Sequence, residues 1–590
     1  MSPNKLYKFL SFLLLTIPQF PCSAQNRVMV DGFFADWNNL SSLNKDAQGD
    51  GNTSGLDFEE LKAFNDDDYL FLSIETGLEI NLQDFADLVL YIDIDNSKTT
   101  GSSINGIGAD LVYKLGERSG TFYISGSPFS IRQIDIGLIT APTVTSERFE
   151  IAIKKEIAVN GITKSMANTI KLMFKDVSNN GDQIPSINGG IEYTFQDNNL
   201  AALPKYSIKK PSKSDLRIIS YNVQKDGIFK AERVSMYTRI LKAVNPDIIG
   251  FQEIYNNSSQ QVANHIETML PSAAGEKWHH AKANPDCHAI SRYPILKSSQ
   301  IPGSSGSGNG AFLIDLPNTT ADILLIVAHP PCCSNNEGRQ MEVDLIMQFL
   351  REAKAGKGPI PLQKDASIVI LGDMNFVGDA NQLETLITGD IANEATYGSD
   401  FTPDWDGNNL IDCKPPTTDI PFTFSWYSEN STFSPGRLDY ILYSGSNLLL
   451  DNTYTLFTPG LDKDSLNTYK LMARDVVDAS DHLPVVADFT LKNKTTTRIS
   501  DFKEGINNIA LYPNPTRGIT DLSITTIHAD LVTIELLDHN GKTIDILCEK
   551  NLPLGDHIIS FNAEKYASGI YILKLRTEDL NEYLKLNILH

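Results

Sequence analysis

The sequence predicts a multidomain protein in which a central α/β domain is flanked by an N-terminal β-sandwich and a small C-terminal β-sandwich. Three observations predict this fold class. A chain of 590 residues is too long for one hydrophobic core. Its middle part alternates apolar strands with helical segments, and short β-rich runs separated by turn clusters lie on both sides. With 41% hydrophobic and 21% charged residues, the composition is that of ordinary globular domains.

The N-terminus has the pattern of a secretory signal peptide over residues 1–24. Lys5 and Lys8 precede an apolar run over residues 9–17, and the small residues that end at Ala24 form a cleavage site. The apolar run is too short to cross a bilayer, and no later segment offers another 20 or so apolar residues. We therefore expect export through the periplasm and no membrane span in the mature chain.

Residues 26–200 read as a β-sandwich accessory module. Runs rich in β-branched and aromatic residues recur between turn clusters, at residues 69–74, 88–92, 149–153 and 170–174. Residues 201–214 are rich in Pro, Lys and Ser, which is typical of a linker.

One loop of this module has the ligand spacing of a calcium loop. Asp46, Gln48 and Asp50 stand at its positions one, three and five, Gly51 stands at six, and Asp57 stands at twelve. The flanking segments look like strand and turn, and Gln48 and Asp57 are weaker choices than Asp and Glu at their positions. A Ca²⁺ site and an acidic surface turn therefore both stay open.

The predicted α/β domain covers residues 215–492. Linker-like residues 493–508 follow it, and a small β-domain over residues 509–590 ends the chain. In the α/β domain we expect strands over residues 216–223, 248–253, 324–328 and 368–371, and helices over residues 233–244 and 342–353.

Polar residues recur where the apolar strands of this domain end. In "LGDMN", for example, Asp373 and Asn375 leave a strand on the same face, because side chains of a strand repeat every two residues. One such residue is more often a turn or cap residue than a catalytic one. Together they supply the carboxylates, amides and imidazoles that divalent-metal phosphate chemistry needs: Asn222, Glu253, His329, Asp373, Asn375, Asp439, Asp481 and His482.

The order of these motifs resembles the endonuclease/exonuclease/phosphatase superfamily, which includes deoxyribonuclease I. The segments that carry the resemblance are "YNV", "PDIIGFQE", the histidine of "IVAHPP", "GDMN", "RLDYIL" and "SDHLPV". The resemblance covers residues 215–492. It implies a four-layer α/β/β/α sandwich with the active site at one end of two packed sheets.

A hard cation, Mg²⁺ or Mn²⁺, would offset the negative charge of a phosphodiester before water attacks it. Glu253 is the first choice as its ligand. The amide oxygen of Asn222 and the carboxylate of Asp481 are expected to complete the metal site.

Five residues are expected to be catalytic. Asp373 is suited to orient and deprotonate the attacking water, and Asn375 to hold water or a phosphate oxygen. The resemblance implies that His482 contacts the phosphorane while Asp439 holds its other ring nitrogen. It also implies that His329 serves as a general acid or phosphate donor.

The sequence leaves open the role of Arg339 and the identity of one acidic or polar partner. Arg339 could bind phosphate from the helix after His329, or it could be a solvated residue on the helix face. The acidic or polar partner that the family places between "QE" and the first histidine is either Asp286 or His288.

The cysteines predict a bridge of uncertain connectivity. Loss of the signal peptide leaves an odd number in an oxidising compartment: Cys287, Cys332, Cys333, Cys413 and Cys548. A bridge between Cys287 or Cys413 and one of the adjacent pair is one arrangement, but the connectivity stays open. We interpret Cys332 and Cys333 as part of a structural bridge and not as nucleophiles.

The two flanking domains also resemble known modules. "VDGFFADWNNL" and "LYIDIDNSKTTG" resemble family-nine-like carbohydrate-binding modules, which implies carbohydrate as a candidate ligand of residues 26–200. "LYPNPTRGI", "IELLDHNGKTI" and "ASGIYILKLRT" resemble the C-terminal sorting domain of type IX secretion substrates. This second resemblance implies the type IX machinery as a partner and a secreted or cell-surface location.

We therefore predict a secreted, metal-dependent phosphodiesterase, with extracellular nucleic acid as the preferred substrate by analogy. A net charge of −23 does not favour nonspecific binding to polyanions, although it leaves a local basic groove open. The alternatives are a phospholipid or small-molecule phosphoesterase of the sphingomyelinase kind, and an inactive surface binding protein.

Overall fold

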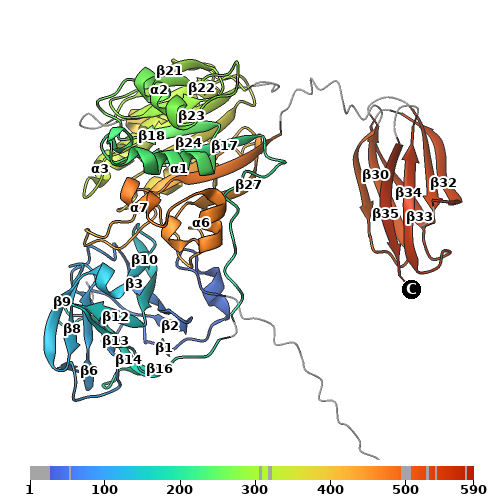
Figure 1. The fold of residues 1–590 in the computed structure, drawn as a ribbon. Helices are drawn as coiled ribbons and strands as arrows, with labels where there is room; N and C mark the ends of the chain where they lie inside the picture. The colour runs from blue at the N-terminus through green and yellow to red at the C-terminus, as the bar shows by residue number, and fades with distance from the viewer. Residues whose placement is uncertain are drawn as a thin grey trace, which may run out of the picture. The chain divides into compact units, whose positions relative to one another are not determined.

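The computed structural model describes residues 27–589 except 52–54, 199, 304–307, 317–321, 493–505, 527–529, 539–540, 554 and 578–580. The chain forms two compact units, Met1–Thr495 and Thr496–His590 (Figure 1). The predicted signal peptide over residues 1–24 and most of the predicted linker over residues 493–508 lie outside the described residues. None of the helices in the described part is long and apolar enough to cross a membrane.

Residues 28–195 form the predicted β-sandwich. Its first sheet has the spatial order β1 (Asn44–Lys45), β2 (Glu60–Asn65), β3 (Tyr69–Ile80), β11 (Ser146–Lys154) and β10 (Ile139–Ala141). Its second sheet has the order β15 (Gln183–Ile184), β14 (Thr169–Asp176), β4 (Leu88–Asp93), β7 (Leu111–Lys114), β8 (Ser119–Ile124) and β9 (Ser127–Ile131), and β16 (Ile191–Thr194) also pairs with β14. The remaining elements are η1 (Phe34–Asn39), β5 (Ser102–Ile104), β6 (Ile107–Ala109), η2 (Gln133–Ile136), β12 (Glu156–Val159) and β13 (Ile162–Ser165).

Strand β3 is apolar on both faces because both are covered. Leu70, Leu72 and Ile74 point into the core between the two sandwich sheets. Phe71 points the other way and packs against Phe422 of the central domain. This is why the sequence of β3 shows a continuous apolar run where a half-exposed strand would alternate.

The central domain contains two mixed sheets. The first has the order β19 (His279–Lys282), β20 (His288–Ser291), β18 (Ile248–Gln252), β17 (Leu216–Asn222), β28 (Val485–Leu491) and β27 (Leu448–Thr455). The second has the order β21 (Ile295–Ile301), β22 (Asn309–Ile314), β23 (Ile323–Ala328), β24 (Ser367–Asp373), β26 (Asp439–Tyr443) and β25 (Ile411–Asp412). The helical elements are η3 (Gly227–Phe229), α1 (Val234–Val244), α2 (Ser259–Met269), α3 (Asn336–Lys354), α4 (Asn381–Thr388), α5 (Glu394–Tyr397), η4 (Thr458–Gly460), α6 (Lys463–Tyr469) and α7 (Asp475–Ala479).

These elements form four layers. One core lies between the sheets and joins residues such as Ile218 of β17 to Leu371 of β24. Helices α1 and α2 pack on the outer face of the first sheet, and α3 packs on the outer face of the second. Gly250 of β18 makes the sheet contact close, since a Cβ there would lie 2.3 Å from a side-chain carbon of Leu371. The predicted α/β/β/α arrangement is therefore confirmed.

The two expected helices are present, and one is longer than predicted. Helix α1 buries Tyr237, Ile240, Leu241 and Val244, the i, i+3, i+4, i+7 pattern of one helix face. Helix α3 begins at Asn336, two turns before the predicted start at Glu342. The side chain of Asn335 caps it by accepting a hydrogen bond from the Gly338 N–H. Its first turns are polar, so the apolar period alone did not reveal them.

The β-sandwich and the central domain pack against each other within the first unit. Val30 exchanges backbone hydrogen bonds with the segment around Phe422: its N–H donates to Pro421 O, and its carbonyl accepts from Thr423 N–H. Residues 201–214, predicted as a linker, include Ile208, which is fully buried in the core beneath α1. The boundary between the two domains of this unit stays our prediction.

The second unit is a small β-sandwich. One sheet has the order β29 (Ile506–Tyr512), β30 (Ile519–Thr526) and β33 (Gly555–Asn562). The other has the order β32 (Thr543–Leu552), β31 (Asp530–Leu537), β34 (Gly569–Arg576) and β35 (Asn581–Ile588). A core that includes Leu522, Ile534 and Leu573 lies between them.

Candidate active site

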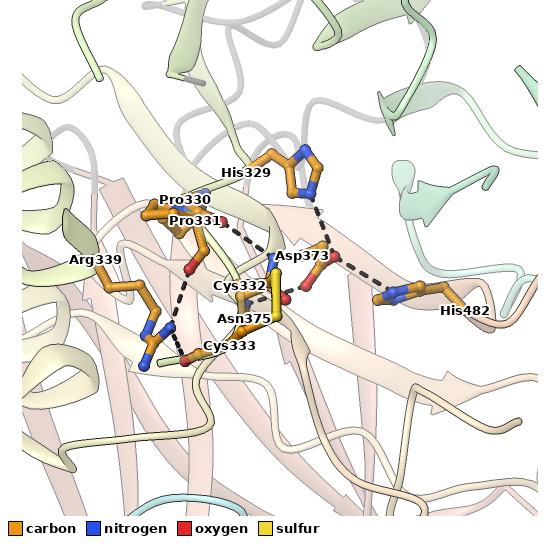
Figure 2. Close-up of a disulfide and its surroundings, with 9 residues drawn as sticks. All are labelled: His329, Pro330, Pro331, Cys332, Cys333, Arg339, Asp373, Asn375 and His482. Atoms are coloured by element: carbon orange, nitrogen blue, oxygen red, sulfur yellow. Dashed lines mark hydrogen bonds and ion pairs between the residues drawn. A yellow bond between two sulfur atoms is a disulfide. The ribbon is translucent and has the colours of Figure 1, made fainter. Parts of the chain in front are cut away.

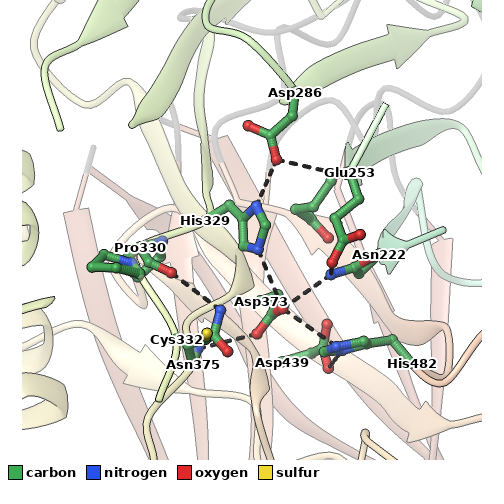
Figure 3. A network of polar contacts seen from close by, with 12 residues as sticks. Asn222, Glu253, Asp286, His329, Pro330, Cys332, Asp373, Asn375, Asp439 and His482 are labelled. Carbon is green, nitrogen blue, oxygen red and sulfur yellow. Dashed lines mark hydrogen bonds and ion pairs between the residues drawn. The ribbon is translucent and has the colours of Figure 1, made fainter. Parts of the chain in front are cut away.

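The strand-end residues of the central domain converge at one end of the two packed sheets. Strands β17 and β18 are parallel, so Asn222 and the residues after Gln252 come to the same sheet edge. In the second sheet β23 and β24 are also parallel, and Asp373 pairs with Asp439 across β24 and β26. Residues far apart in the sequence therefore meet, as Figure 3 shows.

Asp373 lies at the centre of this cluster and is 1% exposed. Its Oδ2 atom accepts a hydrogen bond from Asn222 Nδ2 at 3.0 Å. The same oxygen lies 3.6 Å from Nε2 of His329 and 3.4 Å from Nε2 of His482. One carboxylate oxygen thus faces an amide and two imidazoles, which is a suitable position for a base that handles a proton of the attacking water.

Each of the two histidines is held by a second aspartate. His482 Nδ1 lies 2.8 Å from Oδ2 of Asp439, and His329 Nδ1 lies 2.5 Å from Oδ2 of Asp286. The other ring nitrogen of each histidine, Nε2, faces Asp373. The pairing settles the alternative left open by the sequence: Asp286 is the partner of the first histidine.

His288 has a different environment. Its Nε2 donates to the carbonyl of Ile254 at 3.0 Å, and the ring is fully buried. Burial lowers the pKa of His288 to about 4, so the ring stays neutral inside β20.

The surrounding charges set the protonation of the two site histidines. Burial lowers the pKa of His329, but the hydrogen bond to Asp286 and the charges of Asp373 and Asp286 outweigh it and raise the pKa to about 9. His482 is also buried, and the negative charges of Asp439 and Asp373 likewise raise its pKa above the ordinary value. The surrounding carboxylates therefore favour the protonated form of both rings, which can donate a proton from Nε2.

Glu253 and Asp373 share a hydrogen-bond donor, the side-chain amide of Asn222. Oε1 of Glu253 accepts from Asn222 Nδ2 at 3.0 Å, and its Oε2 accepts from the Lys225 N–H at 2.8 Å. Glu253 adopts a left-handed backbone conformation with φ 63°, and its N–H donates to Asp286 Oδ2 at 3.2 Å. A left-handed conformation is costly for a residue with a side chain, so the contacts around Glu253 must hold it there.

Asn375 joins the site from the loop after β24. It also has a left-handed conformation, with φ 51°. Its backbone N–H donates to Asp373 Oδ1 at 3.1 Å, and its Nδ2 donates to the carbonyl of Pro330 at 3.1 Å. Its side chain thus links the "GDMN" loop to the loop that follows His329.

The backbone carbonyl of Asp481 accepts from the Tyr427 N–H, and the charge of its side chain contributes to the raised pKa of His482. Its role as a metal ligand stays a prediction. Arg339 does not join the cluster. Arg339 is fully buried, and its guanidinium donates to the carbonyls of Pro331 and Cys333. It also donates to Asn336 and Gln382. Arg339 is therefore placed as a brace of the loop and not as a phosphate ligand, because its donors are already used inside the protein.

The candidate calcium loop gathers a different set of acids from the predicted one. Ligand atoms of Asp46, Asp50 and Asp182 lie within 4.8 Å of one another. Asp57 instead accepts from the backbone N–H groups of Gly49 and Gly51. Gln48 is exposed. Asp182 lies far from this loop in the sequence, so the spacing pattern could not identify it.

The structure supplies the cysteine connectivity that the sequence left open, and it does not pair Cys287 or Cys413 with the adjacent cysteines. Cys332 and Cys333 form a disulfide with each other, while Cys287 and Cys413 are free and buried. Burial raises the pKa of both free thiols well above the ordinary value, so neither is a nucleophile. Cys548 is also free.

The residues at the site fit a hard divalent cation. The carboxylates of Glu253 and Asp373 approach the same Asn222 amide, and ligand atoms of Asp373, Asp439 and His482 lie within 4.8 Å of one another. Oδ1 of Asp439 is buried without a hydrogen-bond partner among the described residues. Carboxylate and amide oxygens are the donors that Mg²⁺ prefers, and a divalent cation would offset the negative charge of these carboxylates.

Comparison with protein families gives two matches. Residues 219–482 match the profile described as "Endonuclease/Exonuclease/phosphatase family", and residues 510–588 match the one described as "Secretion system C-terminal sorting domain". Both matches lie outside residues 26–200, so carbohydrate binding there stays a prediction. The sorting domain makes this a secreted or cell-surface protein, as predicted.

Among curated proteins, an uncharacterized protein of Caenorhabditis elegans, F14F9.5, is 23% identical over 192 residues. The match covers 29% of this chain and 56% of that protein, so this chain spans about half the length of its curated relative.

Among solved structures, the human Nocturnin catalytic domain is 16% identical, with a TM-score of 0.30, and the match covers 48% of this chain and 97% of that one. The protein ANGEL2, described as a 2′,3′-cyclic phosphatase, is 14% identical, with a TM-score of 0.32 and coverage of 48% and 98%. Sphingomyelinase C from Streptomyces griseocarneus is 14% identical, with a TM-score of 0.28 and coverage of 46% and 98%.

Proposed function

We propose that this protein, whose central domain belongs to the endonuclease/exonuclease/phosphatase family, is a secreted Mg²⁺-dependent phosphodiesterase that hydrolyses nucleic acid. The observation that carries the proposal is the convergence of Glu253, Asp373, Asp439 and His482 on one cluster at the end of two packed sheets.

Glu253 and the amide oxygen of Asn222 are the groups that would hold the cation, beside Asp373. When bound, a divalent cation supplies positive charge that stabilises the phosphoryl oxygens during attack. Mn²⁺ has the same preference for oxygen ligands and is the alternative ion. Asp481 lies next to His482 in the sequence, and its role as a further ligand stays part of this proposal.

The chain's own groups can handle the protons of the reaction. Asp373 accepts a proton from the attacking water, because its Oδ2 faces the centre of the cluster. His329, whose pKa is raised to about 9, donates a proton to the leaving alkoxide. Its side chain is 14% exposed, so substrate can reach it.

His482 and Asn375 stabilise and orient the phosphate. The cationic ring of His482 is held by Asp439, which is itself fixed by a hydrogen bond of 2.7 Å from the Ser425 hydroxyl. Preorganised donors of this kind stabilise the charge that develops in the transition state. Asn375 is held by Pro330 through its Nδ2, and its amide oxygen is suited to orient water.

The flanking modules support an extracellular role. We propose that the type IX secretion machinery exports the chain through its C-terminal sorting domain. We also propose that Asp46, Asp50 and Asp182 hold Ca²⁺ in the N-terminal sandwich, and that this sandwich binds carbohydrate. The acid cluster supports the first of these ideas, and the sequence resemblance supports the second.

A substrate panel tests the proposal. The purified full-length mature protein is incubated with plasmid DNA, RNA, sphingomyelin or bis-p-nitrophenyl phosphate, each with Mg²⁺ or with EDTA. We expect Mg²⁺-dependent cleavage of nucleic acid that EDTA abolishes. Cleavage of sphingomyelin alone would assign the site to a lipid phosphoesterase, and no turnover on any substrate would indicate a surface binding protein. Ca²⁺ titration of the same protein, against a variant with Asp182→Asn, tests the N-terminal site.

A further inference from the structure

The Cys332–Cys333 disulfide lies at the edge of the active site. It follows His329 by three residues in the loop that continues β23, and Figures 2 and 3 both draw Cys332 beside Asn375. Both cysteines are exposed, whereas Pro330 before them is buried. The sulfur pair is therefore an apolar surface that faces outward next to the catalytic groups.

This disulfide does not contribute to the stability of the fold in the usual way. A disulfide stabilises a protein mainly by closing a loop of the unfolded chain, and the effect grows with the length of that loop. Cys332 and Cys333 are adjacent, with a sequence separation of one, so the bond closes no loop of the chain. Because the pair is exposed, it adds little to any core. We therefore look for a role of the disulfide in the loop that carries it, next to the active site.

The surrounding structure holds the pair in place from two sides. On the site side, Asn375 Nδ2 donates to the carbonyl of Pro330 at 3.1 Å. On the helix side, Arg339 Nη1 donates to the carbonyls of Pro331 and Cys333 at 3.1 and 2.7 Å (Figure 2). Cys333 itself has the left-handed φ of 66°.

Burial of the charged Arg339 side chain costs solvation free energy, and the hydrogen bonds to the loop carbonyls offset part of this cost. The cation is fully buried in α3, and burial lowers the pKa of Arg339. Two of its contacts hold the backbone on either side of Cys332. The fold thus uses a buried charge to fix the orientation of an exposed, rigid sulfur surface.

We propose that the Cys332–Cys333 disulfide is a substrate contact on which the nucleobase next to the scissile phosphate packs. Sulfur is polarisable and makes favourable contacts with aromatic rings. A nucleobase is planar, and it packs on a flat apolar surface without needing hydrogen bonds from the protein. This inference rests on the proposed hydrolysis of nucleic acid, and it identifies the part of that site which recognises the base.

Three esters with the same leaving group test the inference. These are thymidine 5′-(p-nitrophenyl phosphate), its abasic deoxyribose counterpart and methyl p-nitrophenyl phosphate, each hydrolysed by the full-length mature protein. Cys332 and Cys333 are both changed to Ser, and Ser334→Ala, an exposed change in the same loop, is the matched control. We expect the double variant to raise KM for the thymidine ester roughly two- to tenfold, the size of sulfur–aromatic contacts. The values of kcat, and KM for the other two esters, should stay unchanged.

Reduction of the wild-type protein gives an independent arm. Tris(2-carboxyethyl)phosphine converts the disulfide into two thiols, while the phosphine takes up oxygen from water and becomes the phosphine oxide. We expect the same rise in KM for the thymidine ester and no effect on the double Ser variant. Cys287, Cys413 and Cys548 are already free thiols, so they do not contribute to the change. The melting temperature should not fall, because the bond closes no loop.

The results with the three esters distinguish failure of the nucleobase contact from failure of the phosphodiesterase function. Equal losses on all three esters would show that the pair only shapes the loop, and no change on any would show that the surface does not touch substrate. Both results overturn the nucleobase contact while the phosphodiesterase function stands. If the wild-type protein hydrolyses none of the three esters with Mg²⁺, the proposed function fails, and the contact fails with it.

Discussion

At the scale of single residues, Asp373 is the group on which the site depends. Its Oδ2 is the one atom that Asn222, His329 and His482 approach together. The two histidines are held in turn by Asp286 and Asp439, so the protonation of each ring depends on a pair of carboxylates. An amide in place of the Asp373 carboxylate would keep the shape and remove the charge.

We predict that Asp373→Asn lowers kcat by about 10²-fold or more, since a positioned general base contributes about this much. The change is checked by steady-state hydrolysis of bis-p-nitrophenyl phosphate, with circular dichroism to show that the fold is intact. Asp379→Asn makes the same chemical change at an exposed position on the following segment, and it should leave kcat within a factor of two or so. Equal losses in both variants would remove Asp373 from the mechanism.

The lowered pKa of His288 predicts how the free energy of unfolding depends on pH. Its folded pKa is about 4, below the value of about 6.5 expected in the unfolded chain. Between these values the unfolded chain binds a proton that the folded protein does not, so stability falls as the pH drops from 6.5 to 4. The full loss from this residue is up to about 3 kcal/mol.

The matched variant is His288→Gln, because a Gln amide can still donate to the carbonyl of Ile254 and does not titrate. Urea unfolding at pH 7 and at pH 4.5 measures the difference. We expect the wild-type protein to lose more stability than the Gln variant over this interval. A parallel loss in both proteins would show that His288 is not responsible.

At the scale of elements, the loops that hold the site are themselves held by the N-terminal sandwich. Ser425 Oγ donates to Asp439, and Leu483 N–H donates to the carbonyl of Ser425, so the segment over residues 420–437 fixes both Asp439 and the chain around His482. The sandwich contacts this segment through Thr140, whose hydroxyl lies 2.6 Å from that of Ser434. It contacts the "GDMN" loop through Asn81, which donates to Val377 O at 2.6 Å.

Thr143 of the sandwich bridges the two loops directly. Its hydroxyl lies 3.0 Å from the carbonyl of Phe376 and 3.3 Å from that of Arg437, and these residues lie one position after Asn375 and two before Asp439. We predict that Thr143→Val lowers stability by about 1 kcal/mol, the usual contribution of one hydrogen bond. Because the loops carry site residues, kcat/KM should fall by up to about fivefold.

Thermal unfolding and steady-state kinetics on the same preparations measure both effects. Thr143→Ser keeps the hydroxyl and is the conservative control, so it should restore most of the loss in kcat/KM. If the Ser variant loses as much kcat/KM as the Val variant, the hydroxyl bridge has no part in positioning the site.

At the scale of the whole molecule, the chain separates into two units, Met1–Thr495 and Thr496–His590. The cluster around Asp373 and all its contacts lie in the first unit. The second unit has its own core between two sheets. Catalysis and export are therefore expected to be separable.

We predict that a mature chain ending at Thr495 keeps kcat/KM within about twofold of the full-length value, because every site residue named above precedes Thr495. A chain that lacks residues 26–200 should lose most activity, since the loops around the site lose Thr143 and Asn81. Purified proteins are compared on the same ester, and culture fractions report export. Full activity without residues 26–200 would show that the sandwich does not support the site.

The sequence by itself determined which residues of the central domain meet at the end of its two sheets. Asn222, Glu253, His329, Asp373, Asn375, Asp439 and His482 were predicted from strand ends and motif order, and the structure brings them together. This succeeds because a strand's period of two and the parallel order of neighbouring strands predict which ends meet. The four-layer fold follows from the same alternation of strands and helices, together with the family resemblance.

Only the tertiary structure decided which groups pair. Asp286 rather than His288 meets His329 across 43 residues, and Asn222 meets Asp373 across 151. Cys332 bonds to its neighbour and not to Cys287, and Arg339 points into the protein and not toward a phosphate. The physical reason is that local pattern sets the face and the end of each strand, whereas the packing of two sheets and of the loops between them sets the distance between side chains remote in the sequence.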